Sequence, residues 1–372
     1  MVATEAGNDA AARDARAAGL VIGESLIAAE PGNPTRMREQ ATAWGAQAMT
    51  LIRLGEVEAA REAFDSQIGF LRDIAAADNS GQVPLQAAVI RAGRALGLAG
   101  LGEAARGYLD EGVTLARDIA ARQPDDTDAR LQFASALSTL ATVAGRDGDS
   151  ATIRAALTEA AETLRGAGAA GRHDLVVVLA RLGDTALAAD DVTAAGDAYR
   201  EAQDLAETAL TEAGDDPAAV TVAQRDLILA LNAQGQLEGT RGDLRVAYDA
   251  FAQAIAVARD LRALAGDTAY PDPSFAELLA RQATYGIFVS EDEAAETAAR
   301  AALDLLPDSP AATRALAHAL MFKGDTDAAR AIYDPLMANE EGRAAVLSDF
   351  AALAFLGRQA TLMDELRDIA AE

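Results

Sequence analysis

The amino-acid sequence predicts an all-α protein built as a stack of antiparallel helix pairs, and three observations carry this prediction. A short residue pattern recurs along the 372-residue chain, alanine supplies much of the apolar content, and the prolines fall between predicted helix pairs. Alanine is the best helix former and lets helices approach closely. A stack of repeats also accommodates a length at which single hydrophobic cores stop growing, about 250–300 residues.

The recurring pattern begins at a turn residue. Gly55 is followed by Ala60 five residues later and by Phe64 nine residues later. Similar residues stand at these offsets from Gly100, Asp190, Gly242, Ser290 and Gly324. Gly145 keeps the spacing with weaker residues, Ser150 and Arg154, so the sequence predicts Gly145 as the turn of the third repeat. A fixed spacing of this kind is the signature of a repeat protein.

A small residue stands seven positions before each turn residue. These small residues are Ala48, Gly93, Ser138, Gly183, Gly235, Ala283 and Ala317. Only Gly, Ala or Ser fits where two helices cross closely, and residues four apart on a helix share one face. We therefore expect the small residue of each first helix to cross the second helix beside the alanine and the larger residue that follow the turn.

The prolines mark the boundaries between the helix pairs, because proline breaks a helix interior but is accepted in turns and first turns. Pro335 is the exception, since it lies near the end of the last second helix. The others are Pro31, Pro34, Pro84, Pro124, Pro217, Pro271, Pro273, Pro307 and Pro310.

These boundaries predict a single solenoid over residues 1–372. It consists of a lone N-terminal helix in 1–30, seven helix-pair repeats in 31–339 and capping helices in 340–372. A repeat helix without its partner exposes an apolar face, and the ends of such stacks normally need capping. We therefore expect that the chain begins inside a larger protein or that another subunit covers the first helix.

Composition excludes several classes of function. The net charge of −26 argues against binding to nucleic acid or to an anionic membrane, because phosphate would be repelled. The acidity indicates either a requirement for solubility or a basic partner. The chain has no cysteine, hence no disulfide and no thiolate metal site. Because no stretch approaches the roughly 20 apolar residues of a membrane helix and the first 20 residues are charged, we predict a cytoplasmic protein.

The sequence offers no catalytic or metal-binding constellation. Its two histidines, His173 and His318, lie in different repeats, whereas a metal site needs three or four converging ligands. The stretch Gly166–Gly171 fits a dinucleotide-binding expression but no strand precedes it. We expect His318 to be a hydrogen-bonding surface residue, and we predict that the protein is not an enzyme and holds no cofactor or metal.

The succession of small residue, glycine turn, alanine, aromatic residue and proline resembles the tetratricopeptide repeat family. The repeats of about 45 residues, with tails such as Arg72–Ala75 and Arg117–Ala120, look like the extended bacterial version of this family. Trp44 is the one match to the tryptophan of the family's first helix. The resemblance implies a right-handed superhelical solenoid of antiparallel helix pairs whose first helices line a concave groove.

The implied groove supplies the candidate binding residues. Mapped onto this chain they are Arg91, Arg94, Arg181, Asp184, Asn232, Gln236, Arg281, Thr284, Arg314 and His318. Arginines recurring on one face could hold an extended peptide with acidic side chains or a free carboxylate. The alternative is that they pair with carboxylates of neighbouring repeats. The lysine and asparagine pattern of the family's carboxylate clamp is not reproduced.

The sequence therefore favours a non-catalytic scaffold that binds a protein or peptide. Its resemblance to repeats attached to caspase-like peptidases and other effector domains suggests the sensing or regulatory module of a larger bacterial protein. One alternative is a structural module that forms homo-oligomers through the N-terminal helix. An enzyme of unrecognised type is the remaining alternative.

Overall fold

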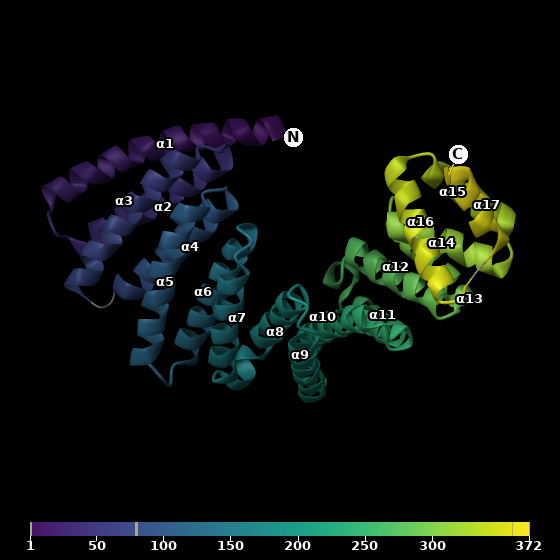
Figure 1. Ribbon diagram of the computed structural model, residues 1–372. Helices are drawn as coiled ribbons and strands as arrows, with labels where there is room; N and C mark the ends of the chain where they lie inside the picture. The colour runs from purple at the N-terminus through teal and green to yellow at the C-terminus, as the bar shows by residue number, and fades with distance from the viewer. Residues whose placement is uncertain (1, 79–80, 359, 372) are drawn as a thin grey trace. The chain divides into compact units, whose positions relative to one another are not determined.

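The computed structural model describes residues 2–78, 81–358 and 360–371, and these residues form seventeen α-helices and no strand. The all-α prediction is thus confirmed. The chain divides into two compact units, residues 1–178 and 179–372, and the boundary falls within one helix (Figure 1). A single continuous solenoid remains a prediction.

The N-terminal unit contains one long unpaired helix, α1 (Val2–Ala29), followed by three helix pairs. The paired helices are α2 (Pro34–Leu54), α3 (Val57–Ala77), α4 (Gln82–Leu98), α5 (Gly102–Arg122), α6 (Thr127–Arg146) and α7 (Ser150–Arg165). A short 3-10 helix (Gly168–Gly171) leads into α8 (Arg172–Leu187), which crosses the boundary between the units. Within the unit, each first helix packs against its own second helix, and α3 and α5 also pack against the first helix that follows (Figure 1).

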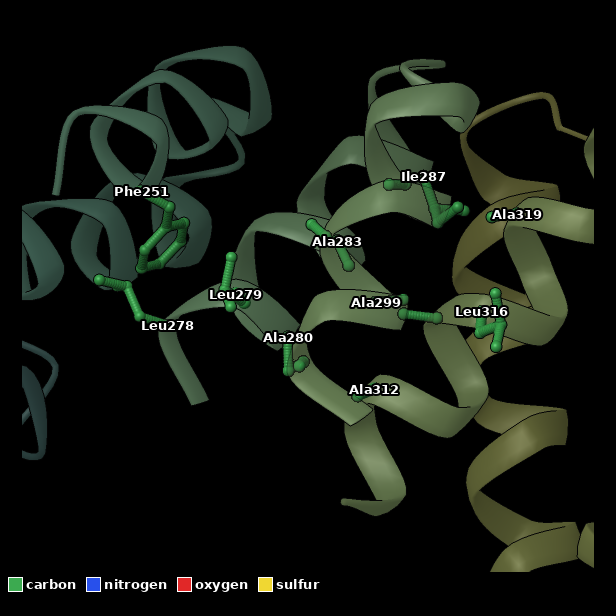
Figure 2. Close-up of a cluster of buried hydrophobic side chains, with 14 of the residues drawn as sticks. Phe251, Leu278, Leu279, Ala280, Ala283, Ile287, Ala299, Ala312, Leu316 and Ala319 are labelled. Carbon is green, nitrogen blue, oxygen red and sulfur yellow. The ribbon is translucent and has the colours of Figure 1, made fainter. Parts of the chain in front are cut away.

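The C-terminal unit begins in α8 and continues the same alternation. Its helices are α9 (Val192–Ala213), α10 (Pro217–Arg241), α11 (Leu244–Ala265), α12 (Asp272–Phe288), α13 (Asp292–Leu305), α14 (Pro310–Lys323), α15 (Thr326–Met337), α16 (Glu340–Phe355) and α17 (Thr361–Ala371). A 3-10 turn (Asp267–Ala269) follows α11. Small and large residues alternate in the core of this unit, where Ala283 and Ala299 lie among Leu279, Leu316 and Ile287 (Figure 2).

The turn inside each pair requires a left-handed residue. Gly242 has φ 87° and Gly324 has φ 88°, and the following residue donates its amide to the carbonyl five positions back, as Asp325 does to Leu320 at 2.9 Å. Such a bond closes the end of a helix. Asp190 (φ 58°) and Ser290 (φ 65°) occupy the same place without being glycine, although this conformation is costly for other residues.

The third repeat corrects the sequence prediction. Gly145 lies within α6, and the left-handed residue is Gly148, with φ 69°. Asp149 then donates to the carbonyl of Ala144 at 3.1 Å, as in the other turns. The pattern is therefore displaced by three residues, so that Ala141 and Leu157, both buried, take the places assigned to Ser138 and Arg154. Ser150 and Arg154 did not fit the repeat pattern because the predicted register was wrong by three residues.

The small residues of the first helices lie against the large residues of the second helices. A Cβ atom at Gly93 would lie 2.6 Å from Cγ of Leu109, and one at Gly235 would lie 2.8 Å from the ring of Phe251. At Gly183 it would lie 2.5 Å from Cδ1 of Tyr199 and closer still to Cε1. A side chain therefore has no room at these three crossing points, as the sequence pattern predicted.

Candidate binding surface on the first helices

A hollow of about 600 Å³ opens between α4 and α6, two first helices of the N-terminal unit. Its apolar lining includes Ala87 and Ile90 of α4 and Leu131 of α6. Arg91 and Arg94 of α4 line it as well. The remaining residues are Val83, Gln86, Gln132, Ser135, Ala136, Thr139 and, from α8, Asp174. The hollow thus combines an apolar lining with two guanidinium groups and one carboxylate, that of Asp174.

Arg91 and Arg94 are exposed, and among the described residues neither makes a hydrogen bond or an ion pair. They are three residues apart and so share one face of α4, on either side of the buried Ala92 and Gly93. Helix α4 itself contains no carboxylate that could pair with them. Both guanidinium groups are therefore available to a ligand.

Charge is unevenly distributed among the helices of this unit. The first helices α2, α4 and α6 contain more arginines than carboxylates, although the whole chain carries a net charge of −26. The arginines are Arg36, Arg38, Arg53, Arg91, Arg94, Arg130 and Arg146, and the carboxylates are Glu39 and Asp128. Because charges beyond about 8 Å are largely screened at physiological salt, this local excess matters more to a bound ligand than the distant carboxylates.

Two arginines of the second helices, Arg72 and Arg117, are in a different situation. Arg72 of α3 pairs with Glu111 of α5 at 2.7 Å, and Arg117 of α5 pairs with Glu159 of α7 at 2.9 Å. These bonds join second helices of successive repeats. Exposed pairs of this kind contribute at most about 1 kcal/mol each. Their main consequence is that these arginines are already occupied.

A second hollow, of about 520 Å³, lies between α12 and α14 in the C-terminal unit. Arg281 and Thr284, both predicted as groove residues, line it together with Tyr285. Arg281 is bound to Glu277 at 2.6 Å, and the Thr284 hydroxyl donates to the carbonyl of Ala280 at 2.9 Å. The predicted residues are thus on the expected face but engaged within α12.

Four other predicted residues lie on α8 and α10. Asp184 accepts a hydrogen bond of 2.6 Å from the hydroxyl of Tyr199, and Arg181 is half-buried. Burial lowers the pKa of Arg181, and the charge of Asp184 opposes this effect. On α10, the Gln236 amide donates to the carbonyl of Asn232 at 3.4 Å. These contacts stabilise the local structure and give no sign of a ligand site.

His318 corrects a second sequence expectation, because it is only 5% exposed rather than a surface residue. Its Nδ1 lies 2.6 Å from the Tyr333 hydroxyl and its Nε2 lies 3.2 Å from Oδ2 of Asp349. Arg314 donates to the same Asp349 oxygen at 2.8 Å. A neutral imidazole with its proton on Nε2 satisfies both neighbours. His318 and Arg314 thus join α14 to α15 and α16.

The sequence contains a pattern that predicts Asp184 and His318 as hydrogen-bonding partners of buried tyrosines. Asp184 and His318 each follow the small residue of their first helix, and each lies fifteen positions before a tyrosine. A buried tyrosine hydroxyl needs a hydrogen-bonding partner. Where a tyrosine occupies the crossing position of the second helix, the residue after the small residue therefore serves as that partner.

Two further observations concern metal-binding groups and membrane-spanning helices. No group of three or more His, Cys, Asp or Glu within residues 2–78, 81–358 and 360–371 is placed to hold a metal ion. Over the same ranges, no helix is both long and apolar enough to cross a membrane.

No family model matches the sequence, and no curated protein sequence does. Solved structures match by shape. BtubC from P. vanneervenii is 15% identical with a TM-score of 0.52, over 67% of this chain and 90% of BtubC. The signal transduction ATPase with numerous domains from Pyrococcus horikoshii, which has a tetratricopeptide repeat sensor, is 15% identical with a TM-score of 0.51 over 99% of this chain. The chain has a tetratricopeptide-repeat fold.

The same tetratricopeptide-repeat fold relates the chain to the apo form of RapI, at 10% identity and a TM-score of 0.50 over 89% of this chain and 85% of RapI. The chain spans 50% of the length of the Pyrococcus ATPase. In tetratricopeptide-repeat terms, the hollow between α4 and α6 lies on the face formed by first helices. The fold thereby gives the two unpaired arginines a place on the face where the sequence predicted binding.

Proposed function

We propose that the protein is a non-catalytic scaffold that binds an extended peptide segment carrying carboxylates on the first-helix face of its N-terminal unit. The observation that carries this proposal is that Arg91 and Arg94 are exposed and unpaired among the described residues beside an apolar hollow. Guanidinium groups bind carboxylates through two parallel hydrogen bonds. The lining residues Ile90 and Leu131 would hold an apolar side chain of the same segment.

A selection from a displayed peptide library on the immobilised protein tests this proposal. We expect the selected peptides to combine an apolar residue with Asp or Glu. The double substitution Arg91→Glu and Arg94→Glu should raise the dissociation constant of a selected fluorescein-labelled peptide at least about tenfold, because charge-assisted hydrogen bonds contribute about 1.5–3 kcal/mol. Fluorescence anisotropy measures this constant.

The matched control is the pair Arg154→Glu and Arg259→Glu, which changes the net charge by the same amount. Both residues are exposed on second helices, α7 and α11, and neither has a hydrogen bond or ion pair among the described residues. The control should bind the peptide like the unmodified protein. Equal weakening in both double variants, or selected peptides without acidic residues, would argue against the α4 and α6 site.

We further propose that this scaffold is the sensing or regulatory module of a larger bacterial protein with an effector domain, such as a caspase-like peptidase. The repeat sensor named for the Pyrococcus ATPase, which this chain matches over 99% of its own length, supports this role. An antibody raised against the repeats should then detect a polypeptide larger than 38.4 kDa in cells that produce the protein. A single band of 38.4 kDa would contradict the proposal.

A further inference from the structure

Helix α1 has one face packed on the fold and one face open. Its inner face contacts α2 through the buried Leu20, whose carbonyl accepts a hydrogen bond of 3.0 Å from Gln40, and through an ion pair of 2.8 Å between Asp9 and Arg53. On the outer face Val21 and Ile22 are each 63% exposed and Leu26 is 41% exposed. Figure 1 shows α1 at the edge of its unit.

The outer face of α1 has the spacing of a helix that packs along another helix. A stripe of exposed residues, here called the α1 stripe, recurs at alternating intervals of four and three positions. It consists of Ala11, Ala15, Ala18, Ile22, Ser25 and Ala29. This heptad spacing is the pattern of a helix–helix seam. The charged Asp14 at its side is paired with Arg13 of the same helix at 2.9 Å.

The repeats themselves indicate which kind of element covers such a face. In the second helices, Ala60 and Phe64 of α3 and Ala195 and Tyr199 of α9 are buried, and an antiparallel first helix lies against them. On α1 the residues with the same spacing, Ala15 and Gly19, are exposed, and a Cβ atom at Gly19 would meet nothing within 4 Å. The complete repeats therefore favour an antiparallel helix as the covering element.

We propose that this element is helix α1 of a second copy of the chain. The exposed residues of α1 are small in the N-terminal half of the helix, with Ala11 and Ala15, and bulky in the C-terminal half, with Ile22 and Leu26. An antiparallel pair with its two-fold axis between Ala18 and Gly19 places Ile22 opposite Ala15 and Leu26 opposite Ala11 of the partner. A two-fold interface requires a surface that is complementary to itself. A parallel pair would instead place bulky residues on bulky ones.

The net charge of −26 on each chain opposes dimerisation, but the α1 stripe itself contains no charged residue, so no charge has to be buried in the seam. The antiparallel pair also places Glu30, directly after α1, near the positive N-terminal end of the partner helix. A single pair of helices buries less than the roughly 1,600 Å² of a standard interface, so we expect a weak dimer whose population depends on concentration.

Sedimentation velocity of the full chain at concentrations up to about 100 µM, at which a dimer with a dissociation constant of about 100 µM or less is populated, tests the dimer. We expect a concentration-dependent shift towards twice the monomer mass of 38.4 kDa. Ala18→Glu, which places like charges across the axis, should keep the protein monomeric. Ala17→Glu is the control, because Ala17 is exposed on α1 outside the stripe and should leave dimerisation unchanged.

Cysteine substitutions test the direction of the pair, because the chain has no cysteine of its own. Ala18→Cys should form a disulfide-linked dimer under mild oxidation. Ala11→Cys alone should not, because its two copies lie roughly 20 Å apart in the antiparallel pair, whereas Ala11→Cys combined with Leu26→Cys should. A strict monomer, a dimer that survives Ala18→Glu, or crosslinking by Ala11→Cys alone would overturn the proposal.

Discussion

Substitution Gly183→Leu is expected to destabilise the protein by at least about 2 kcal/mol, because the new side chain would overlap the ring of Tyr199. Even a Cβ atom would lie 2.5 Å from Cδ1 of that ring, and Tyr199 is only 1% exposed, so the ring has little room to move. Leucine favours a helix over glycine by about 1 kcal/mol, which offsets only part of the overlap. Urea unfolding followed by circular dichroism measures the loss.

Gly107→Leu is the matched control for this prediction. Gly107 is exposed within α5, and a Cβ atom there would meet nothing within 4 Å. The control should be neutral or stabilising, because only the helix propensity changes. If both leucine variants unfolded at the same urea concentration, the close crossing at Gly183 would not be the cause of the loss.

The second large effect is expected at Asp349, where Asp349→Ala should lower the free energy of unfolding by about 2 kcal/mol at pH 7. The substitution removes the carboxylate that accepts hydrogen bonds from both Arg314 and His318. Loss of one partner of a fully buried pair costs about 3–5 kcal/mol, and the 28% exposure of the Asp349 side chain reduces this value. Asp364→Ala is the control, because Asp364 is 68% exposed and, among the residues that the structure describes, pairs only with Arg367.

This effect should depend on pH in one direction. Burial alone would raise the pKa of Asp349, but the hydrogen bonds from His318 and Arg314 and the charge of Arg314 outweigh burial and lower it below its usual 3.8. The stabilisation is therefore complete above pH 3.8 and is lost as the pH falls through the lower pKa of the folded state. The difference in unfolding free energy between the unmodified protein and Asp349→Ala should shrink as the pH falls below about 3.8. A difference that grows towards low pH would contradict this assignment.

The repeat pattern could be predicted from the sequence because each crossing point demands a particular size of side chain. Gly93, Gly183 and Gly235 are small because Leu109, Tyr199 and Phe251 fill the space beside them. The third repeat was misplaced because Gly145 preserved the 45-residue step, although the backbone requires the left-handed residue at Gly148. Spacing alone does not reveal which of two nearby glycines has a positive φ.

The candidate site was predictable in part. The resemblance to tetratricopeptide repeats implied that Arg91 and Arg94 lie on the first-helix face, where the structure has a hollow. Spacing could not reveal which arginines are already paired, because the partners of Arg281 and Arg314 are decided by side-chain positions. His318 was misjudged because its partner Asp349 lies 31 residues away, on a helix outside the repeat pattern.

The central claim, that a small residue of the first helix makes room for a large residue of the second, is tested most directly by a double-mutant cycle between Gly183 and Tyr199. Unfolding free energies of Gly183→Leu, Tyr199→Ala and the double variant are compared with that of the unmodified protein. We predict that the leucine fills the space left by the tyrosine ring, so that the double variant loses at least about 1 kcal/mol less than the sum of the single losses. Additive losses, within about 0.5 kcal/mol, would contradict the claim.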